Sequence, residues 1–228
     1  MRKTTLTIVR HAESALNGIM ANSPSFFSDS KTRDLFLNTP DHKVPITERG
    51  VTQATLTGKG LGKNEIKYCV AVHTGYTRTK QTLEQIKVFV RVEDVEENVD
   101  LRERENGHSY VMTKDELNEN FPWNEQYWKT FGPVFARPIG GESLLDVRAR
   151  VKPAIMELVA SHKGENILLV THGRVVSVIR SIFEKWSTDE FESFLKDSSQ
   201  GPINCGVTEY SFDEDLRPTL ITYNQKYW

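Results

Sequence analysis

The sequence predicts an α/β sandwich built around a mainly parallel sheet. Three short apolar runs, at residues 6–9, 67–73 and 166–170, are typical of buried strands. Amphipathic stretches typical of helices alternate with them, most clearly at residues 143–162. Because strands that alternate with helices favour parallel pairing, this order indicates the fold class. The chain contains neither a repeat nor a linker, so we expect residues 1–228 to form a single domain.

The remaining elements follow from local patterns. Thr47 is a residue type that caps helices, and the helix after it is expected to run to about Gly58. Apolar residues at helical spacing predict further helices at 77–90, 175–183 and 188–196, with a short one at 114–120. Further short strands are expected at 99–101, 207–212 and 219–223.

Two stretches interrupt this alternation. Residues 17–44 hold many Ser, Asn, Asp and Pro residues with little periodicity, which predicts a long loop. Residues 107–140 are mixed and include aromatic side chains between positions 121 and 131. We interpret these aromatics as a small packed cap rather than a base-stacking platform, because no basic residues interleave with them.

Composition limits the classes of partner. A formal net charge of −2 gives no general attraction to nucleic acid or to an anionic membrane. The apolar N-terminal stretch is too short for a signal peptide, and no other stretch approaches the length of a membrane span. The two cysteines, Cys69 and Cys205, form no C-x-x-C pattern, which is typical of a reducing compartment. We therefore expect a cytoplasmic protein; the sequence leaves the oligomeric state open.

Polar residues follow each of the three apolar strands. The first strand ends at Arg10 and His11, the second leads through His73 to Arg78, and the third ends at His172. Because ligands bind at the carboxyl ends of strands in open α/β sheets, we expect these residues to converge. Arginine forks match phosphate oxygens, and a histidine among them can act as a nucleophile. Such a site still needs a carboxylic acid to protonate the leaving oxygen.

Each of these residues also has a simpler explanation. A histidine at a strand end is often only a polar terminus, and an arginine in the first turn of a helix often faces solvent. A zinc site built from His11, His73 and His172 is disfavoured, because the neighbouring arginines repel a cation and no cysteine or carboxylate completes a ligand set. We expect neither a metal nor a cofactor.

Six short motifs occur in order along the chain, and they are Arg10–Asn17, Pro45–Ala54, Thr74–Thr82, Leu101–Gly107, Gly140–Val151 and Val170–Gly173. Together they resemble those of the histidine phosphatase superfamily, which includes the cofactor-dependent phosphoglycerate mutases. Here Arg-His-Ala stands in place of the family's Arg-His-Gly, so a small residue is retained. A single motif would be weak, but six in the right order are specific.

The resemblance implies a three-layer α/β/α sandwich in which one strand runs against the others. It implies that His11 takes the phosphoryl group and that Glu103 protonates the leaving group; the spacing to Gly107 favours Glu103 over Glu105. Residues implied to bind the phosphoryl group or line its pocket are Arg10, Ser14, Asn17, Arg78, His172 and Gly173.

The acceptor of the phosphoryl group separates phosphatases from mutases in this family. Mutases that resemble this pattern follow the acid with Arg-His-Tyr-Gly, whereas this chain has Arg-Glu-Asn-Gly at residues 104–107. Lys114 is a partial match, but the later paired arginine is not evident at residues 128–131. We therefore predict a phosphomonoester hydrolase with a small phosphorylated substrate. Mutase-type transfer is the alternative, and a non-catalytic phospho-ligand binding module is disfavoured because the nucleophile and both arginines are present.

Overall fold

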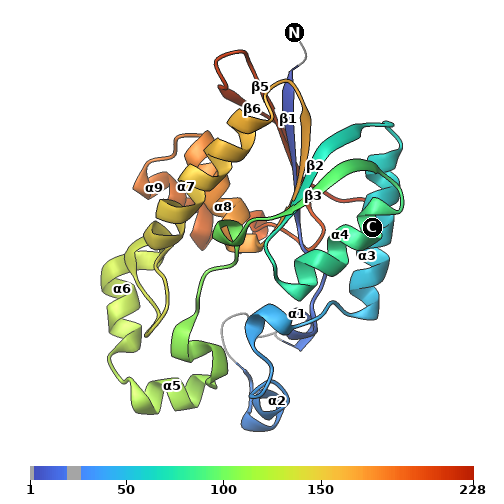
Figure 1. The fold of residues 1–228 in the computed structure, drawn as a ribbon. Coiled ribbons are helices and arrows are strands. Elements are labelled where there is room, and N and C mark those ends of the chain that lie inside the picture. The colour runs from blue at the N-terminus through green and yellow to red at the C-terminus, as the bar shows by residue number, and fades with distance from the viewer. Residues whose placement is uncertain (1–2, 20–26) are drawn as a thin grey trace.

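A computed structural model describes residues 3–19 and 27–228 (Figure 1). Within these residues six strands form one sheet, in the order β3-β2-β4-β1-β5-β6. Strands β1 to β4 pair in parallel, and β5 runs antiparallel to both of its neighbours. This confirms the predicted α/β class with one reversed strand. The strands are β1 Thr4–Arg10, β2 Lys67–His73, β3 Arg91–Glu97, β4 Asn166–Thr171, β5 Val207–Phe212 and β6 Pro218–Gln225.

Helices cover both faces of the sheet (Figure 1). Strand residues alternate between the faces, as a period of two requires. Leu6 and Ile8 of β1 pack into the larger core with residues of α7, α8 and α9, whereas Val9 packs with residues of α3 and α4. The helices are α1 Ala15–Ile19, α2 Ser30–Asp34, α3 Glu48–Gly62, α4 Thr77–Lys87, α5 Lys114–Asn120, α6 Asn124–Phe135, α7 Leu144–Ser161, α8 Gly173–Phe183 and α9 Thr188–Lys196.

Several expectations about local structure were wrong. Residues 99–101 form the 3-10 helix η3 (Val99–Leu101) rather than a strand, because the side chain of Asn98 accepts a hydrogen bond from Asp100 N and caps a turn. Strand β3 was not predicted, because its charged and largely exposed edge carries no apolar run. The helix expected at 77–90 ends at Lys87.

The two interrupting stretches contain short helices. Between residues 27 and 44 the chain forms α2 and the 3-10 helix η2 (Asp41–Lys43) instead of a continuous loop; residues 20–26 lie outside the described part. The second stretch holds α5, α6 and the 3-10 helix η4 (Gly107–Val111), and its aromatic cap is packed only in part. Trp123 is 81% exposed, while the rings of Tyr127 and Phe131 lie 4.9 Å apart.

The carboxyl ends of β1, β2 and β4 share one edge of the sheet. In Figure 1 this edge faces downward, toward α1, α2 and α5. The segment after Glu97 also reaches it, since Asn98 N donates to His73 O at 2.8 Å. In the described part of the chain no helix is both long enough and apolar enough to cross a bilayer.

Candidate active site

A cleft of about 1110 Å³ opens at this edge of the sheet. Seven of the eight residues predicted for the site line it, and the eighth, His172, is fully buried beside it with its ring 5.2 Å from that of His11. His73 instead accepts a hydrogen bond from Gly75 N, and no three metal-ligating side chains cluster within residues 3–19 and 27–228. The lining residues are Arg10, His11, Ser14, Asn17, Arg78, Glu103 and Gly173.

The tautomer of His11 follows from one short contact. Its Nδ1 lies 2.7 Å from the carbonyl oxygen of Ala12. Because a carbonyl oxygen only accepts, Nδ1 carries the proton and Nε2 keeps its lone pair. The backbone N–H of His11 donates to Thr171 O at 2.8 Å, which fixes the residue beyond the end of β1. His11 therefore presents an unprotonated nitrogen from a rigid position.

The surroundings of His11 keep it neutral. Burial lowers its pKa well below the ordinary value, and the positive charges of Arg78 and Arg10 lower it further, against a smaller opposite effect of the Ala12 hydrogen bond. Protonation would place a third cation beside two arginines. A neutral imidazole is the form that a nucleophile requires.

Arg10 approaches the N-terminus of α8. Its Nη1 donates to Pro202 O at 2.6 Å, and its buried Nε has no hydrogen-bond partner in the described part of the chain. Burial lowers the pKa of Arg10, while Glu103 opposes that shift. A side chain at position 173 would begin 3.2 Å from Arg10 Nε, so Gly173 leaves room for the guanidinium. An anion in the cleft would satisfy the unpaired donor.

The guanidinium group of Arg78 binds the carboxylate of Asp41. Nη1 and Nη2 donate to Asp41 Oδ1 and Oδ2 at 2.9 and 3.1 Å, and Nη1 also donates to Asp41 O at 2.6 Å. This bidentate geometry is the one in which guanidinium also binds phosphate. Asp41 was not predicted for the site, because it belongs to residues 17–44, which were expected to form a long loop.

His172 lies at the N-cap of α8. Its Nε2 is 2.8 Å from Thr74 Oγ1, and its Nδ1 has no partner within residues 3–19 and 27–228. Burial lowers its pKa well below the ordinary value, with a further contribution from the charge of Arg78. The ring of Tyr76 packs 4.9 Å from the His172 ring and 4.7 Å from the Arg78 guanidinium. Thr74 and Tyr76 thus contact two predicted residues; both lie in the Thr74–Thr82 motif, but neither was predicted for the site.

Ser14 and Asn17 bond to each other, and Asn17 also bonds to Asn204, a residue that was not predicted for the site. Asn17 N donates to Ser14 Oγ at 3.2 Å, and Ser14 N donates to Asn17 Oδ1 at 3.3 Å. Asn204 Nδ2 donates to Asn17 Oδ1 at 3.1 Å and to His11 O at 2.9 Å. Asn204 lies in the loop before β5, nearly two hundred residues from His11, so only the fold brings it to the site.

Glu103 enters the cleft from an irregular segment between η3 and η4. Its Oε1 accepts from Arg104 N at 2.9 Å, whereas the Glu105 carboxylate is 3.5 Å from Arg102 Nε. Of these two acids, only Glu103 lines the cleft that contains His11.

Further cations line the same cleft, namely Arg104, Lys114 and Arg174. Burial lowers the pKa of Arg104 to about 10, and the charge of Arg174 acts in the same direction. The guanidinium of Arg104 also lies 5.8 Å from the ring of Trp128. The cleft therefore holds positive charge beyond Arg10 and Arg78.

Replacing Asp41 should strengthen binding of inorganic phosphate. A phosphate ion that takes the fork of Arg78 must displace the Asp41 carboxylate, so Asp41→Asn removes a charged competitor. We expect the Kd for phosphate, measured by titration calorimetry, to fall by about 5–30-fold. Asp94→Asn on the exposed strand β3 is the control and should leave it unchanged. An unchanged or weaker affinity of Asp41→Asn would contradict displacement.

Acid should destabilise the protein through His11 and His172. Both have lower pKa values folded than unfolded, so below about pH 6.5 the unfolded chain binds protons that the folded chain does not. The free energy of unfolding should therefore fall as the pH drops, by up to about 1.4 kcal/mol per pH unit for each histidine. Urea unfolding between pH 7.5 and 5.5 should show a shallower decline for His11→Gln. Parallel curves for this variant and the wild type would refute the assignment.

Known proteins resemble this chain in sequence and in fold. The 2,3-bisphosphoglycerate-dependent phosphoglycerate mutase of Bartonella bacilliformis is 27% identical over 193 residues, covering 82% of this chain and 85% of that protein. A phosphoglycerate mutase-like protein of Arabidopsis thaliana is 29% identical over 212 residues, covering 82% and 68%.

Solved structures share the fold. A mycobacterial glucosyl-3-phosphoglycerate phosphatase superposes with a TM-score of 0.70 at 24% identity, covering 99% of this chain and 100% of that one. YhfR from Bacillus stearothermophilus gives a TM-score of 0.73 at 24% identity, with 96% of each chain covered. A sequence model of the histidine phosphatase superfamily (branch 1) matches residues 6–226, and the chain therefore belongs to that superfamily.

Proposed function

We propose that the protein hydrolyses small phosphomonoesters through a phosphohistidine formed on His11. The observation that carries this proposal is the neutral His11, with Nε2 unprotonated, beside the guanidinium groups of Arg10 and Arg78. The arginines neutralise the phosphoryl oxygens, and the imidazole supplies the attacking lone pair. Membership in a superfamily of phosphatases and mutases supports an enzyme rather than a binding module.

The reaction has two steps. In the first, His11 Nε2 forms a bond to phosphorus, the ester P–O bond breaks, and Glu103, as a carboxylic acid, gives its proton to the leaving oxygen. In the second, the Glu103 carboxylate takes a proton from water, the water oxygen bonds to phosphorus, and the N–P bond breaks. Arg10, Arg78, His172 and the N–H of Gly173 hold the transferring group, and Ser14 and Asn17 line its pocket.

Mutase-type transfer is the second candidate. The relatives from Bartonella are named mutases, and Arg104, Lys114 and Arg174 give the cleft positive charge for a second anionic group. Hydrolysis is favoured because Glu105 and Asn106 replace the His-Tyr pair of the mutase pattern. Incubation with 3-phosphoglycerate, with and without a bisphosphate primer, separates the two: interconversion supports the mutase, whereas release of phosphate alone supports the hydrolase.

Removing the nucleophile should abolish turnover. We expect His11→Ala to lower kcat for 4-nitrophenyl phosphate by at least about 10³-fold, because the variant lacks the imidazole that forms the covalent intermediate. His162→Ala, at the C-cap of α7, is the matched histidine control and should retain wild-type activity. Equal rates for His11→Ala and the wild type would rule out the proposed function.

The role of Glu103 as proton donor can be tested with two esters whose leaving groups differ in their need for a proton. Phenyl phosphate has a poorer leaving group than 4-nitrophenyl phosphate and depends more on a proton. Glu103→Gln should therefore lower kcat for phenyl phosphate by about 10²–10⁴-fold and kcat for 4-nitrophenyl phosphate by less than about tenfold. Glu105→Gln is the matched control, and neither rate should fall. A uniform loss on both esters in Glu103→Gln would argue against general acid catalysis.

A further inference from the structure

The segment that carries Glu103 has no regular secondary structure of its own. Residues 102–106 lie between η3 and η4 and belong to neither a helix nor a strand. Their backbone is therefore not held by the hydrogen-bond ladder that fixes His11 and His172 at strand ends. A proton donor must nevertheless lie within hydrogen-bond reach of the leaving oxygen. Something else must hold this segment.

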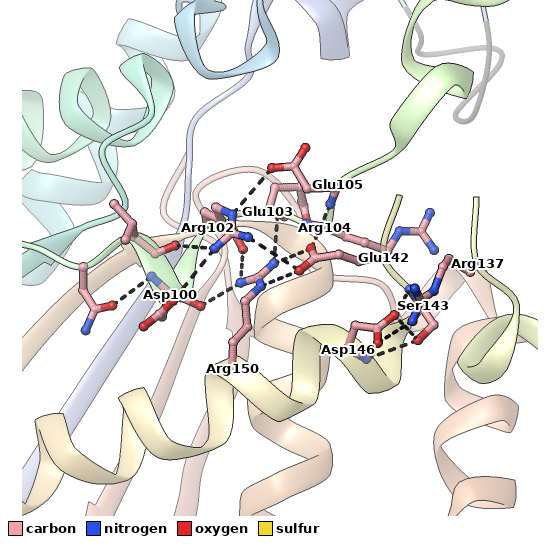
Figure 2. Close-up of polar contacts among 12 residues, drawn as sticks. Asp100, Arg102, Glu103, Arg104, Glu105, Arg137, Glu142, Ser143, Asp146 and Arg150 are labelled. Carbon is pink, nitrogen blue, oxygen red and sulfur yellow. Dashed lines mark hydrogen bonds and ion pairs between the residues drawn. The ribbon is translucent and has the colours of Figure 1, made fainter. Parts of the chain in front are cut away.

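Arg150, on α7, binds backbone carbonyl groups of this segment and of η3 (Figure 2). Its Nη1 donates to the carbonyl oxygens of Asp100 and Arg102 at 2.6 and 2.9 Å, and its Nη2 donates to the carbonyl oxygen of Glu103 at 3.0 Å. Nε and Nη2 also donate to the two carboxylate oxygens of Glu142, each at 2.8 Å. All five N–H groups of the guanidinium are thus used, two of them on the segment that bears Glu103 and one on Asp100 in η3.

Glu142 binds the backbone of the segment on the C-terminal side of Glu103. Its Oε2 accepts from Glu105 N at 3.0 Å, and its own N–H donates to Glu105 O at 2.9 Å. A side chain at position 141 would begin 2.3 Å from Glu105 O, so only glycine permits the two backbones to approach this closely. Burial acts to raise the pKa of Glu142, but hydrogen bonds from Arg150 and from Glu105 N lower it below the ordinary value.

Both partners are fixed to rigid parts of the fold. Glu142 precedes Ser143, the N-cap of α7, where Ser143 and Asp146 form a reciprocal capping box. The side chains of Arg150 and Glu142 are only 13% and 17% exposed, which limits competition from water. Thr171 Oγ1 also donates to Leu101 O at 2.7 Å, which ties the end of η3, directly before the segment, to the last residue of β4.

We propose that Arg150 and Glu142 are positioning residues that hold Glu103 at the distance from the phosphoryl pocket required for proton transfer. Neither side chain lines the cleft, so they act on Glu103 through its backbone and not on the substrate. This inference rests on the proposed function, because it assigns the pair a role in the step that Glu103 performs. The role of Arg150 and Glu142 differs from that of Arg10 and Arg78, which in the proposed function bind the phosphoryl group itself.

Arg150→Lys tests the proposal, because lysine keeps the charge but cannot reproduce five donors in a planar fork. We expect kcat for phenyl phosphate to fall about 10–100-fold, since small misplacements of catalytic groups have effects of this size. The kcat for 4-nitrophenyl phosphate should fall less than about threefold, and the Kd for inorganic phosphate should stay within about twofold. Arg148→Lys, two residues away on α7, is the matched control and should behave as the wild type.

A double-mutant cycle distinguishes positioning from general damage. In the Glu103→Gln background, Arg150→Lys should lower kcat for phenyl phosphate by less than about threefold more, because the group that it positions is already gone. Glu142→Gln is the second variant and should lower the phenyl phosphate rate selectively, as Arg150→Lys does. Thermal unfolding of each variant shows whether it folds.

The outcomes separate this inference from the proposed function. If turnover requires His11 but Arg150→Lys and Glu142→Gln slow both esters equally, or add their full effect to Glu103→Gln, the positioning role is wrong and the proposed function stands. If His11→Ala turns over both esters as the wild type does, both proposals fall. A selective, non-additive loss on phenyl phosphate supports the positioning role.

Discussion

The parallel pairing of β1 with β4 is the constraint on which the rest of the site depends. In this register Arg10 lies opposite Thr171, and His11 N donates to Thr171 O. The two histidines therefore follow adjacent strand ends, and their rings meet although they are 161 residues apart in sequence. Because these strands are buried on both faces, a one-residue change of register would move the side chains of each core into the other, where they do not fit. Core packing and site geometry are thus set by the same pairing.

Positive charges that lie close together at this edge repel one another, and the fold neutralises them only in part. Arg78 is neutralised by Asp41, but Arg10 has a carbonyl oxygen for one donor and no partner for its Nε in the described part of the chain. The histidines respond by remaining neutral, since burial and the arginine charges lower the pKa of each. The same positive charges that favour an anionic ligand therefore keep His11 unprotonated. An anion-binding cleft and a neutral imidazole have a common physical origin here.

The sequence was sufficient for features that depend on local pattern. Apolar runs predicted β2 at its observed bounds, and Thr47 predicted the start of α3. The eight predicted site residues lie together because each belongs to a motif at an element's end. Local patterns did not predict two elements. Strand β3 has a charged, exposed edge without an apolar run, and residues 99–101 form a 3-10 turn capped by Asn98 instead of a strand. Asp41 and Asn204 reach the cleft only through the fold, so no local signal could identify them.

His11 and Glu103 are held by different kinds of structure. His11 follows a central strand, and its N–H donates to the neighbouring strand β4, whereas Glu103 lies on an irregular segment between two short 3-10 helices. Such a segment gains a fixed position only from side chains that reach its carbonyl groups, and a guanidinium with five donors suits this role better than any other side chain. Arg150 donates to the carbonyl groups of Arg102 and Glu103, to that of Asp100 in η3 and to Glu142, which bonds in turn to Glu105. The position of Glu103 in the cleft therefore depends on the packing of α7 as well as on the sheet, whereas that of His11 depends on the pairing of the strands.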